Sequence, residues 1–129
     1  MTFKELTNFV LKTYPDYFEL GTDDNCNCIV IKKSLFPSFV FVGEEPIIKV
    51  LVDLDMVEFN ELIDLKGLHE GGIPYLSTYK SRTLDLSSLN EFMVGMSMDF
   101  LVPKLQHLQL QLKDYEMKLK MKKLNEDFK

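Results

Sequence analysis

The sequence predicts an α+β fold, in which a small antiparallel sheet of three to five strands is flanked by an N-terminal helix and a long, proline-interrupted C-terminal helix. The middle of the chain holds short runs rich in Ile, Val and Phe, punctuated by Gly and Pro, which is typical of strands. Both ends instead carry apolar residues at helical spacing. With 129 residues, the chain is long enough to bury one real core.

The N-terminal helix is predicted over residues 2–14. Thr2 and Glu5 have the spacing of a capping box, and Pro15 disfavours helix at the residue before it. The apolar side of this helix would bury one stripe, made of Phe3, Leu6, Phe9, Val10, Thr13 and Tyr14.

Three strands are expected next, over residues 26–33, 36–42 and 47–54. In the third run the even positions are all apolar, whereas Lys49 and Asp53 lie on the other face. Residues 43–46 have the composition of a hairpin connection. The segment therefore predicts an antiparallel three-stranded meander.

A short helix is expected after the meander. Asp55 and Glu58 repeat the capping spacing, and Gly67 follows where a helix end needs a left-handed residue. Residues 74–79 and 82–86 then predict one or two further strands at an edge of the sheet, where Pro74 is tolerated.

The last helix is expected to begin at a third capping box, formed by Ser88 and Glu91. Pro103 either kinks this helix or starts a second one. We therefore divide the chain into a globular part, residues 1–102, and a helical extension of the same structural unit, residues 103–129. The first turns carry a stripe expected to cover the sheet, made of Leu89, Phe92, Met93, Met96 and Phe100.

The extension carries apolar residues on two faces. One set alternates by three and four, as in a coiled coil, and we name it the heptad seam: Met98, Leu101, Leu105, Leu108, Leu112, Tyr115 and Leu119. A second stripe lies on a different face: Leu110, Met117, Met121, Leu124 and Phe128. One neighbour cannot bury both. Either the seam packs on the body and the second stripe is merely exposed, or one face packs internally or on a second copy and leaves the other for a different protein.

The charge is unevenly placed along the chain. Residues 1–100 hold 8 Lys+Arg and 16 Asp+Glu, a net charge of −8, whereas residues 101–129 hold 7 Lys and 4 Asp+Glu, a net charge of +3. An acidic body argues against direct nucleic-acid binding, which needs a basic footprint. The lysines of the extension suggest a solvated face, and its acidic residues dilute the charge that membrane-surface binding would need.

No catalytic, cofactor-binding or metal-binding signature stands out, so we expect no enzyme and no cofactor. Cys26 and Cys28 are too close for an unstrained disulfide and lack the spacing of a zinc site. The best enzymatic alternative is Asp53 with Asp64 and Lys66, which loosely resembles the D…(D/E)-x-K arrangement of metal-dependent nucleases. That resemblance covers about a dozen residues.

The source of the protein is inferred from its amino-acid bias, and its function from the apolar extension. The chain lacks alanine and has 14 Lys against one Arg, which suggests an A+T-rich genome such as that of a low-GC bacterium or its phage. No apolar run reaches the ~20 residues of a membrane span and no signal peptide is visible, so we expect a cytoplasmic protein. The leading hypothesis is a homodimeric interaction module that binds and modulates, by inhibition, another protein. An assembly role, in which the extension sets the oligomer number, is the alternative.

Overall fold

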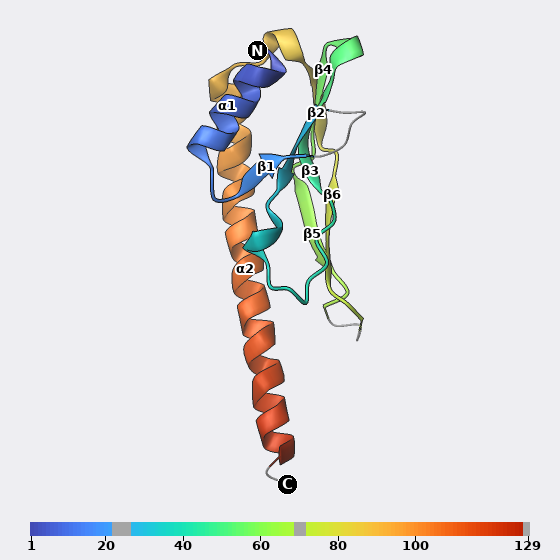
Figure 1. The fold of residues 1–129 in the computed structure, drawn as a ribbon, viewed down its shortest axis with the longest axis vertical. Helices are drawn as coiled ribbons and strands as arrows, with labels where there is room; N and C mark the ends of the chain where they lie inside the picture. The colour runs from blue at the N-terminus through green and yellow to red at the C-terminus, as the bar shows by residue number, and fades with distance from the viewer. Residues whose placement is uncertain (22–26, 69–71, 128–129) are drawn as a thin grey trace.

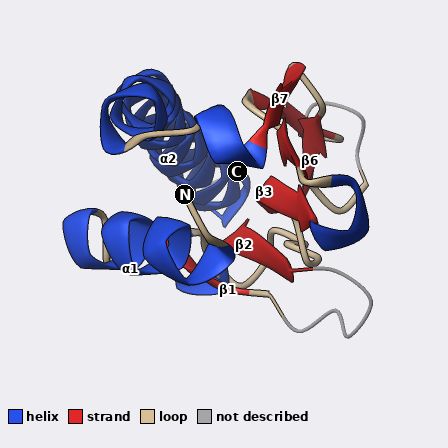
Figure 2. Cartoon of the chain, turned by 90° about the horizontal axis from the view of Figure 1, so that it is seen from above, coloured by secondary structure: helices blue, strands red, loops and turns tan. Residues whose placement is uncertain are grey.

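The computed structural model describes residues 1–21, 27–68 and 72–127, and it has two layers. Helix α1 (Phe3–Thr13) lies beside the first half of the much longer α2 (Glu91–Asp127), and both lie on one side of the sheet (Figures 1 and 2). The N-terminal helix, the antiparallel sheet and the long C-terminal helix confirm the α+β prediction.

The main sheet has five strands in the order β1-β2-β3-β4-β7, and every neighbouring pair is antiparallel. A second sheet holds only the antiparallel pair β5 and β6. The strands are β1 (Phe18–Leu20), β2 (Asn27–Ile31), β3 (Pro46–Leu51), β4 (Met56–Phe59), β5 (Leu62–Lys66), β6 (Tyr75–Tyr79) and β7 (Arg82–Asp85).

The helix predicted after the meander is wrong, because residues 56–66 form β4 and β5. Val57 and Phe59 are buried while Met56 and Glu58 are less so, and this two-residue alternation fits a strand. Asp55 caps no helix and instead takes a left-handed turn with φ 50°, which lets β4 return along β3. The two predicted strands after Gly67 are confirmed as β6 and β7.

Strands β4 to β7 form a long two-stranded ribbon that is interrupted in the middle. Its first half, β4 with β7, belongs to the main sheet, and its second half, β5 with β6, continues beyond it. Glu45, directly before β3, ties the main sheet to the second half, since its carboxylate accepts hydrogen bonds from the main-chain N–H (3.2 Å) and the hydroxyl (3.1 Å) of Thr78.

The predicted meander is also wrong at its middle strand. Residues 36–42 form a loop after a short 3₁₀ turn, and only Phe41 makes a bridge, to Tyr75 of β6. The outer two predicted strands are present as β2 and β3, and they pair directly with each other. Val40 and Val42 are nevertheless buried, so the loop contributes to the core and its apolar composition reflects packing without strand pairing.

Helix α1 begins as predicted. The Thr2 hydroxyl accepts from the Glu5 N–H, and the Glu5 carboxylate accepts from the Thr2 N–H, each at 3.1 Å. These bonds hold the pKa of Glu5 below its usual value. Leu6 and Val10 are fully buried against the core.

Helix α2 begins two residues later than the predicted capping box. Asn90 is the residue that caps it, since its side-chain oxygen accepts from the N–H of Met93 at 2.9 Å, while Ser88 lies in a preceding 3₁₀ turn. Asn is a good N-cap because it satisfies one of the unpaired N–H groups of the first turn. Pro103 does not split the helix, which runs through it as one element of 37 residues.

We predict that Asn90→Ala lowers the free energy of unfolding by about 1 kcal/mol, because it removes this cap. The melting temperature should fall by about 3–5 °C. Ser88→Ala is the matched control and should leave it within experimental error. Equal losses from both variants would show that the cap is misassigned.

Candidate functional site

The inner face of α2 packs on the protein's own body. From Val94 to Leu112 every residue that points at the sheet and α1 is buried, including five residues of the heptad seam: Met98, Leu101, Leu105, Leu108 and Leu112. Tyr115 is half-buried and its ring lies 6.2 Å from that of Phe39, whereas Leu119 is 48% exposed beyond the body. The seam up to Tyr115 is therefore covered within one chain.

The outer face of α2 is apolar and uncovered in its first turns. Phe92, Met96 and Phe100 were expected to cover the sheet, and that prediction is wrong because all three are exposed. Of the same predicted stripe only Leu89 is buried and Met93 half-buried. The face that begins at Val94 is buried instead. It continues over five turns, so its burial removes more apolar surface from water than burial of the shorter predicted stripe would.

The second stripe of the sequence continues this outer face. At 3.6 residues per turn, Leu110 returns to the side of the helix that carries Phe92, opposite the buried seam. We call the combined set the exposed stripe; its members are 56–74% exposed, and they are Phe92, Met96, Phe100, Leu110, Met117, Met121 and Leu124. Phe128, the last residue predicted for the second stripe, lies outside the described residues.

The exposed stripe follows a heptad repeat. The second stripe predicted from the sequence covered only the part of this repeat from Leu110 onward. From Met96 to Leu124 the steps alternate between four and three, through Met96, Phe100, Pro103, His107, Leu110, Asp114, Met117, Met121 and Leu124. The polar and proline positions in its middle conceal the repeat. Carrying the three-four alternation back through Pro103 would have found Phe100 and Met96.

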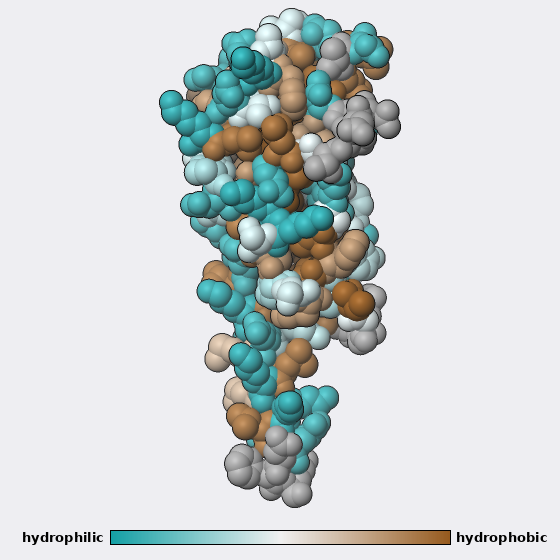
Figure 3. Space-filling view, in the orientation of Figure 1, coloured by the Kyte–Doolittle hydropathy of each residue, from teal (hydrophilic) through white to brown (hydrophobic). Residues whose placement is uncertain are grey.

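The last turns of α2 project past the rest of the protein as an arm (Figure 1). Residues 117–126 are exposed on all sides, and Figure 3 shows apolar side chains among hydrophilic ones along the arm. Two ion pairs four residues apart support the helix, Lys118 with Asp114 at 2.9 Å and Lys120 with Glu116 at 3.8 Å. A segment this short is marginal as a helix alone, so the arm depends on the anchored turns before it.

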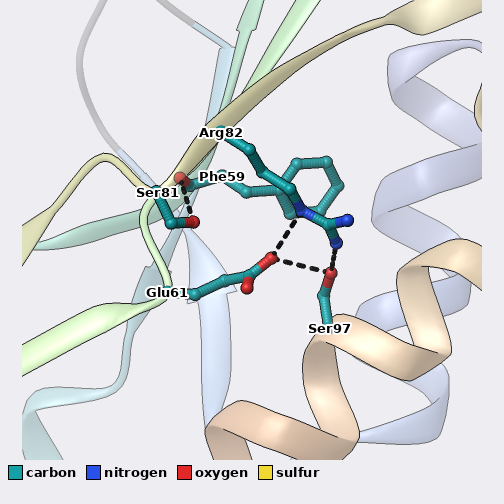
Figure 4. A network of polar contacts seen from close by, with 5 residues as sticks. All are labelled: Phe59, Glu61, Ser81, Arg82 and Ser97. Atoms are coloured by element: carbon teal, nitrogen blue, oxygen red, sulfur yellow. Dashed lines mark hydrogen bonds and ion pairs between the residues drawn. The ribbon is translucent and has the colours of Figure 1, made fainter.

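A polar network fixes α2 on the strand side (Figure 4). Glu61, between β4 and β5, accepts from the Arg82 Nε–H and from the Ser97 hydroxyl, each at 2.9 Å, and Arg82 also donates to Ser97. The guanidinium carbon of Arg82 lies 4.8 Å from the ring centre of Phe59. Since Glu61 is 14% exposed and Ser97 is buried, the network fixes the rotation of α2 about its axis.

Hydrogen bonds on the opposite side of the inner face complete the anchoring. The Tyr14 hydroxyl donates to Asp99 at 3.2 Å. Burial is the main cause that raises the pKa of Tyr14, and this hydrogen bond is the second. The Gln106 amide donates to the Tyr17 hydroxyl and the Gln109 amide to the Leu35 carbonyl, both at 2.9 Å. Held on both sides, α2 can turn its exposed stripe only toward solvent.

A shallow depression adjoins the exposed stripe near its middle. It lies between the loop after β2 and α2, and it is lined by Ser34, Leu35, Phe36, Pro37, Gln106, Gln109, Leu110, Lys113 and Glu116. Leu110 belongs to both features, so the exposed apolar surface broadens there.

The residues of the nuclease-like pattern are not brought together. Asp53 lies in a 3₁₀ turn after β3, whereas Asp64 and Lys66 lie on β5, roughly ten residues along an extended ribbon. Lys66 instead stands 5.0 Å from the ring centre of Tyr79. Among the described residues, no three His, Cys, Asp or Glu side chains cluster as a metal site would require.

The cysteine predictions have different outcomes. Cys28 lies in β2 and is buried, as expected for a small strand residue, and Cys26 lies outside the described residues. Of the two histidines, His107 is exposed on α2 and His69 is not described.

Comparisons with models of protein families, with curated proteins and with solved structures find no match to this chain. Within the described part of the chain, no helix has the length and apolarity needed to span a membrane.

We predict that Leu105→Ala lowers the free energy of unfolding by about 2–5 kcal/mol, because it leaves a cavity where a fully buried side chain stood. The matched change Leu110→Ala, on the exposed stripe of the same helix, should cost less than about 0.5 kcal/mol. Chemical denaturation measures both. Similar costs at the two positions would contradict the assignment of inner and outer faces.

We further predict that Arg82→Met lowers the free energy of unfolding by about 1–3 kcal/mol, since it leaves the Glu61 carboxylate without its charged partner. Lys80→Met, on an exposed neighbour, should change it by less than about 0.5 kcal/mol. An unchanged Arg82→Met variant would mean that the network does not anchor α2.

Proposed function

We propose that this protein is a cytoplasmic interaction module that binds another protein through the exposed stripe of α2, inhibits it by occupying its surface, and carries out no chemistry. The exposed stripe is the observation that carries the proposal. Monomeric proteins rarely leave this many large apolar side chains uncovered on one side of a helix unless that side is used for binding.

The energy available from this surface is sufficient for specific binding. Each large apolar side chain contributes about 1.5–3 kcal/mol when fully buried. The seven side chains of the stripe are already more than half exposed, so a partner removes most of that surface from water. After the entropy of association is subtracted, a few such anchors are enough for a stable complex.

The spacing of the stripe indicates how the partner is bound. Its side chains recur at steps of three, four, seven and ten, which keep them on one side of the helix, as in an amphipathic helix that binds a groove or another helix. Because α2 is fixed on both sides, the stripe is presented in one orientation. Such preorganisation lowers the entropic cost of binding.

An assembly role remains the second candidate, and the arm favours it. Leu119 of the heptad seam and Met117 of the exposed stripe are both exposed there, on different faces. An arm with two apolar faces can join more than two chains. A ring or a polymer in solution would favour assembly over inhibition.

We predict that Met117→Glu/Met121→Glu abolishes capture of the target from a lysate of the native host. Both side chains are exposed, so the variant should keep its far-ultraviolet circular dichroism and melting temperature. Leu62→Glu, an exposed apolar residue of β5, is the matched control and should capture the same protein as the native chain.

The captured protein then supplies the functional readout. Adding the native chain should lower its activity, and adding the double variant should not. If the double variant captures the same proteins as the native chain, the exposed stripe is not the binding surface and the proposal falls.

A further inference from the structure

We propose that the exposed stripe of α2 pairs with the same stripe of a second copy of this chain, as an antiparallel helix pair centred between His107 and Leu110. This inference rests on the proposed function, because it names a partner for the same surface. It is carried by the heptad repeat of the stripe and by the opposite charges of the two ends of the chain.

The repeat has the two kinds of interior position that a helix pair needs. One kind is occupied by Met96, Pro103, Leu110, Met117 and Leu124, and the other by Phe100, His107, Asp114 and Met121. The buried face of α2 lies on the opposite side of the helix, so a second helix reaches the stripe without displacing the body.

The parallel arrangement is electrostatically unfavourable. In register, it places Asp114 directly opposite Asp114 of the second copy, inside the interface. At the flank it places Lys113 beside Lys118 of the second copy, while Asp99 meets Lys104 of the second copy. Like charges at interior and flanking positions oppose pairing.

The antiparallel arrangement removes these contacts. Centred between His107 and Leu110, it sets Phe100 against Met117 of the second copy and Met96 against Met121 of the second copy. Asp114 then faces Pro103 of the second copy and meets no like charge. At the flank, Asp99 lies beside Lys120 of the second copy, and symmetry makes this contact twice.

Neighbouring antiparallel registers are poorer. A shift by one heptad in one direction brings Lys113 beside Lys113 of the second copy. A shift in the other direction moves Leu124 past the start of the partner helix. The chosen register gives every position of the repeat from Met96 to Met121 a counterpart within the repeat, over about 39 Å of helix. Leu124 then faces Met93, which is half-buried.

The wider charge distribution favours the same direction. Residues 113–123 hold five lysines and two acidic residues, whereas residues 1–100 carry a net charge of −8. Antiparallel pairing lays the basic arm of each copy along the first half of the other α2, which is the half attached to the acidic body (Figure 1). The opposite charges of the arm and the body favour antiparallel association, and added salt should weaken it.

Mass in solution gives the first test. Light scattering of the full chain should give twice the chain mass, with dissociation on dilution. Phe100→Glu/Met117→Glu should raise the dissociation constant at least about 30-fold, because it removes two central apolar anchors. The control Leu62→Glu should dimerise like the native chain, and both variants should keep the native melting temperature when measured as monomers.

Direction is tested by cysteine pairing. Single variants Met96→Cys and Met121→Cys, mixed under mild oxidation, should form a disulfide-linked dimer, while neither variant alone should exceed the background of the native chain with its own cysteines. Crosslinking of each variant alone would indicate parallel pairing and overturn the proposal. Lys120→Asp should weaken the dimer roughly 3- to 30-fold, because it sets an acidic residue beside Asp99 of the second copy.

The outcomes separate this inference from the proposed function. A native chain that stays monomeric up to its solubility limit rules out self-pairing, yet the stripe would still be a binding surface if Met117→Glu/Met121→Glu loses its target. A dimer that also captures the target through the same residues supports both, and addition of the target should then dissociate the dimer.

Discussion

The burial of one face of α2 is the interaction on which the rest of the structure depends. α2 has apolar residues on two opposite sides, and the protein has only one body. Packing of the residues from Val94 to Leu112 on the sheet and α1 removes the larger apolar surface from water and completes the core. The same packing places the other apolar side in solvent, so the exposed stripe is a geometric consequence of how the core is built.

Polar contacts hold the inward side of α2 in place. Glu61, Arg82 and Ser97 act on one side of α2, and Tyr14 with Asp99 acts on the other. Apolar packing alone is tolerant of small rotations, whereas hydrogen bonds depend steeply on distance and angle. These groups contribute orientation as well as stability, because removing one of them leaves its partner without a hydrogen bond. A surface intended for binding benefits most from such orientation.

The sequence predicted the fold class, both terminal helices and the strands β2, β3, β6 and β7, because each depends on local periodicity or on a local cap. The prediction failed where pairing with strands distant in the sequence determines the local structure. Residues 55–67 carry a capping spacing that predicts helix, yet β3 and β7 offer hydrogen-bonding partners on both edges of β4, and the two-residue alternation through Val57 and Phe59 agrees with them. Residues 36–42 have strand composition but no neighbouring edge with which to pair over their length.

The functional surface was only half visible for a related reason. Periodicity shows that a helix has two apolar faces, but not which one the body covers, and so Phe92, Met96 and Phe100 were assigned to the wrong side. Once the covered side is known, the roles of the two polar interior positions, His107 and Asp114, can be assigned. In a buried face they would each require a partner, whereas in an exposed stripe they limit which helices can pair with it. Asp114 opposes its own equivalent in a parallel pair and meets Pro103 in an antiparallel one, so a residue that weakens the stripe as an apolar surface makes it specific in direction.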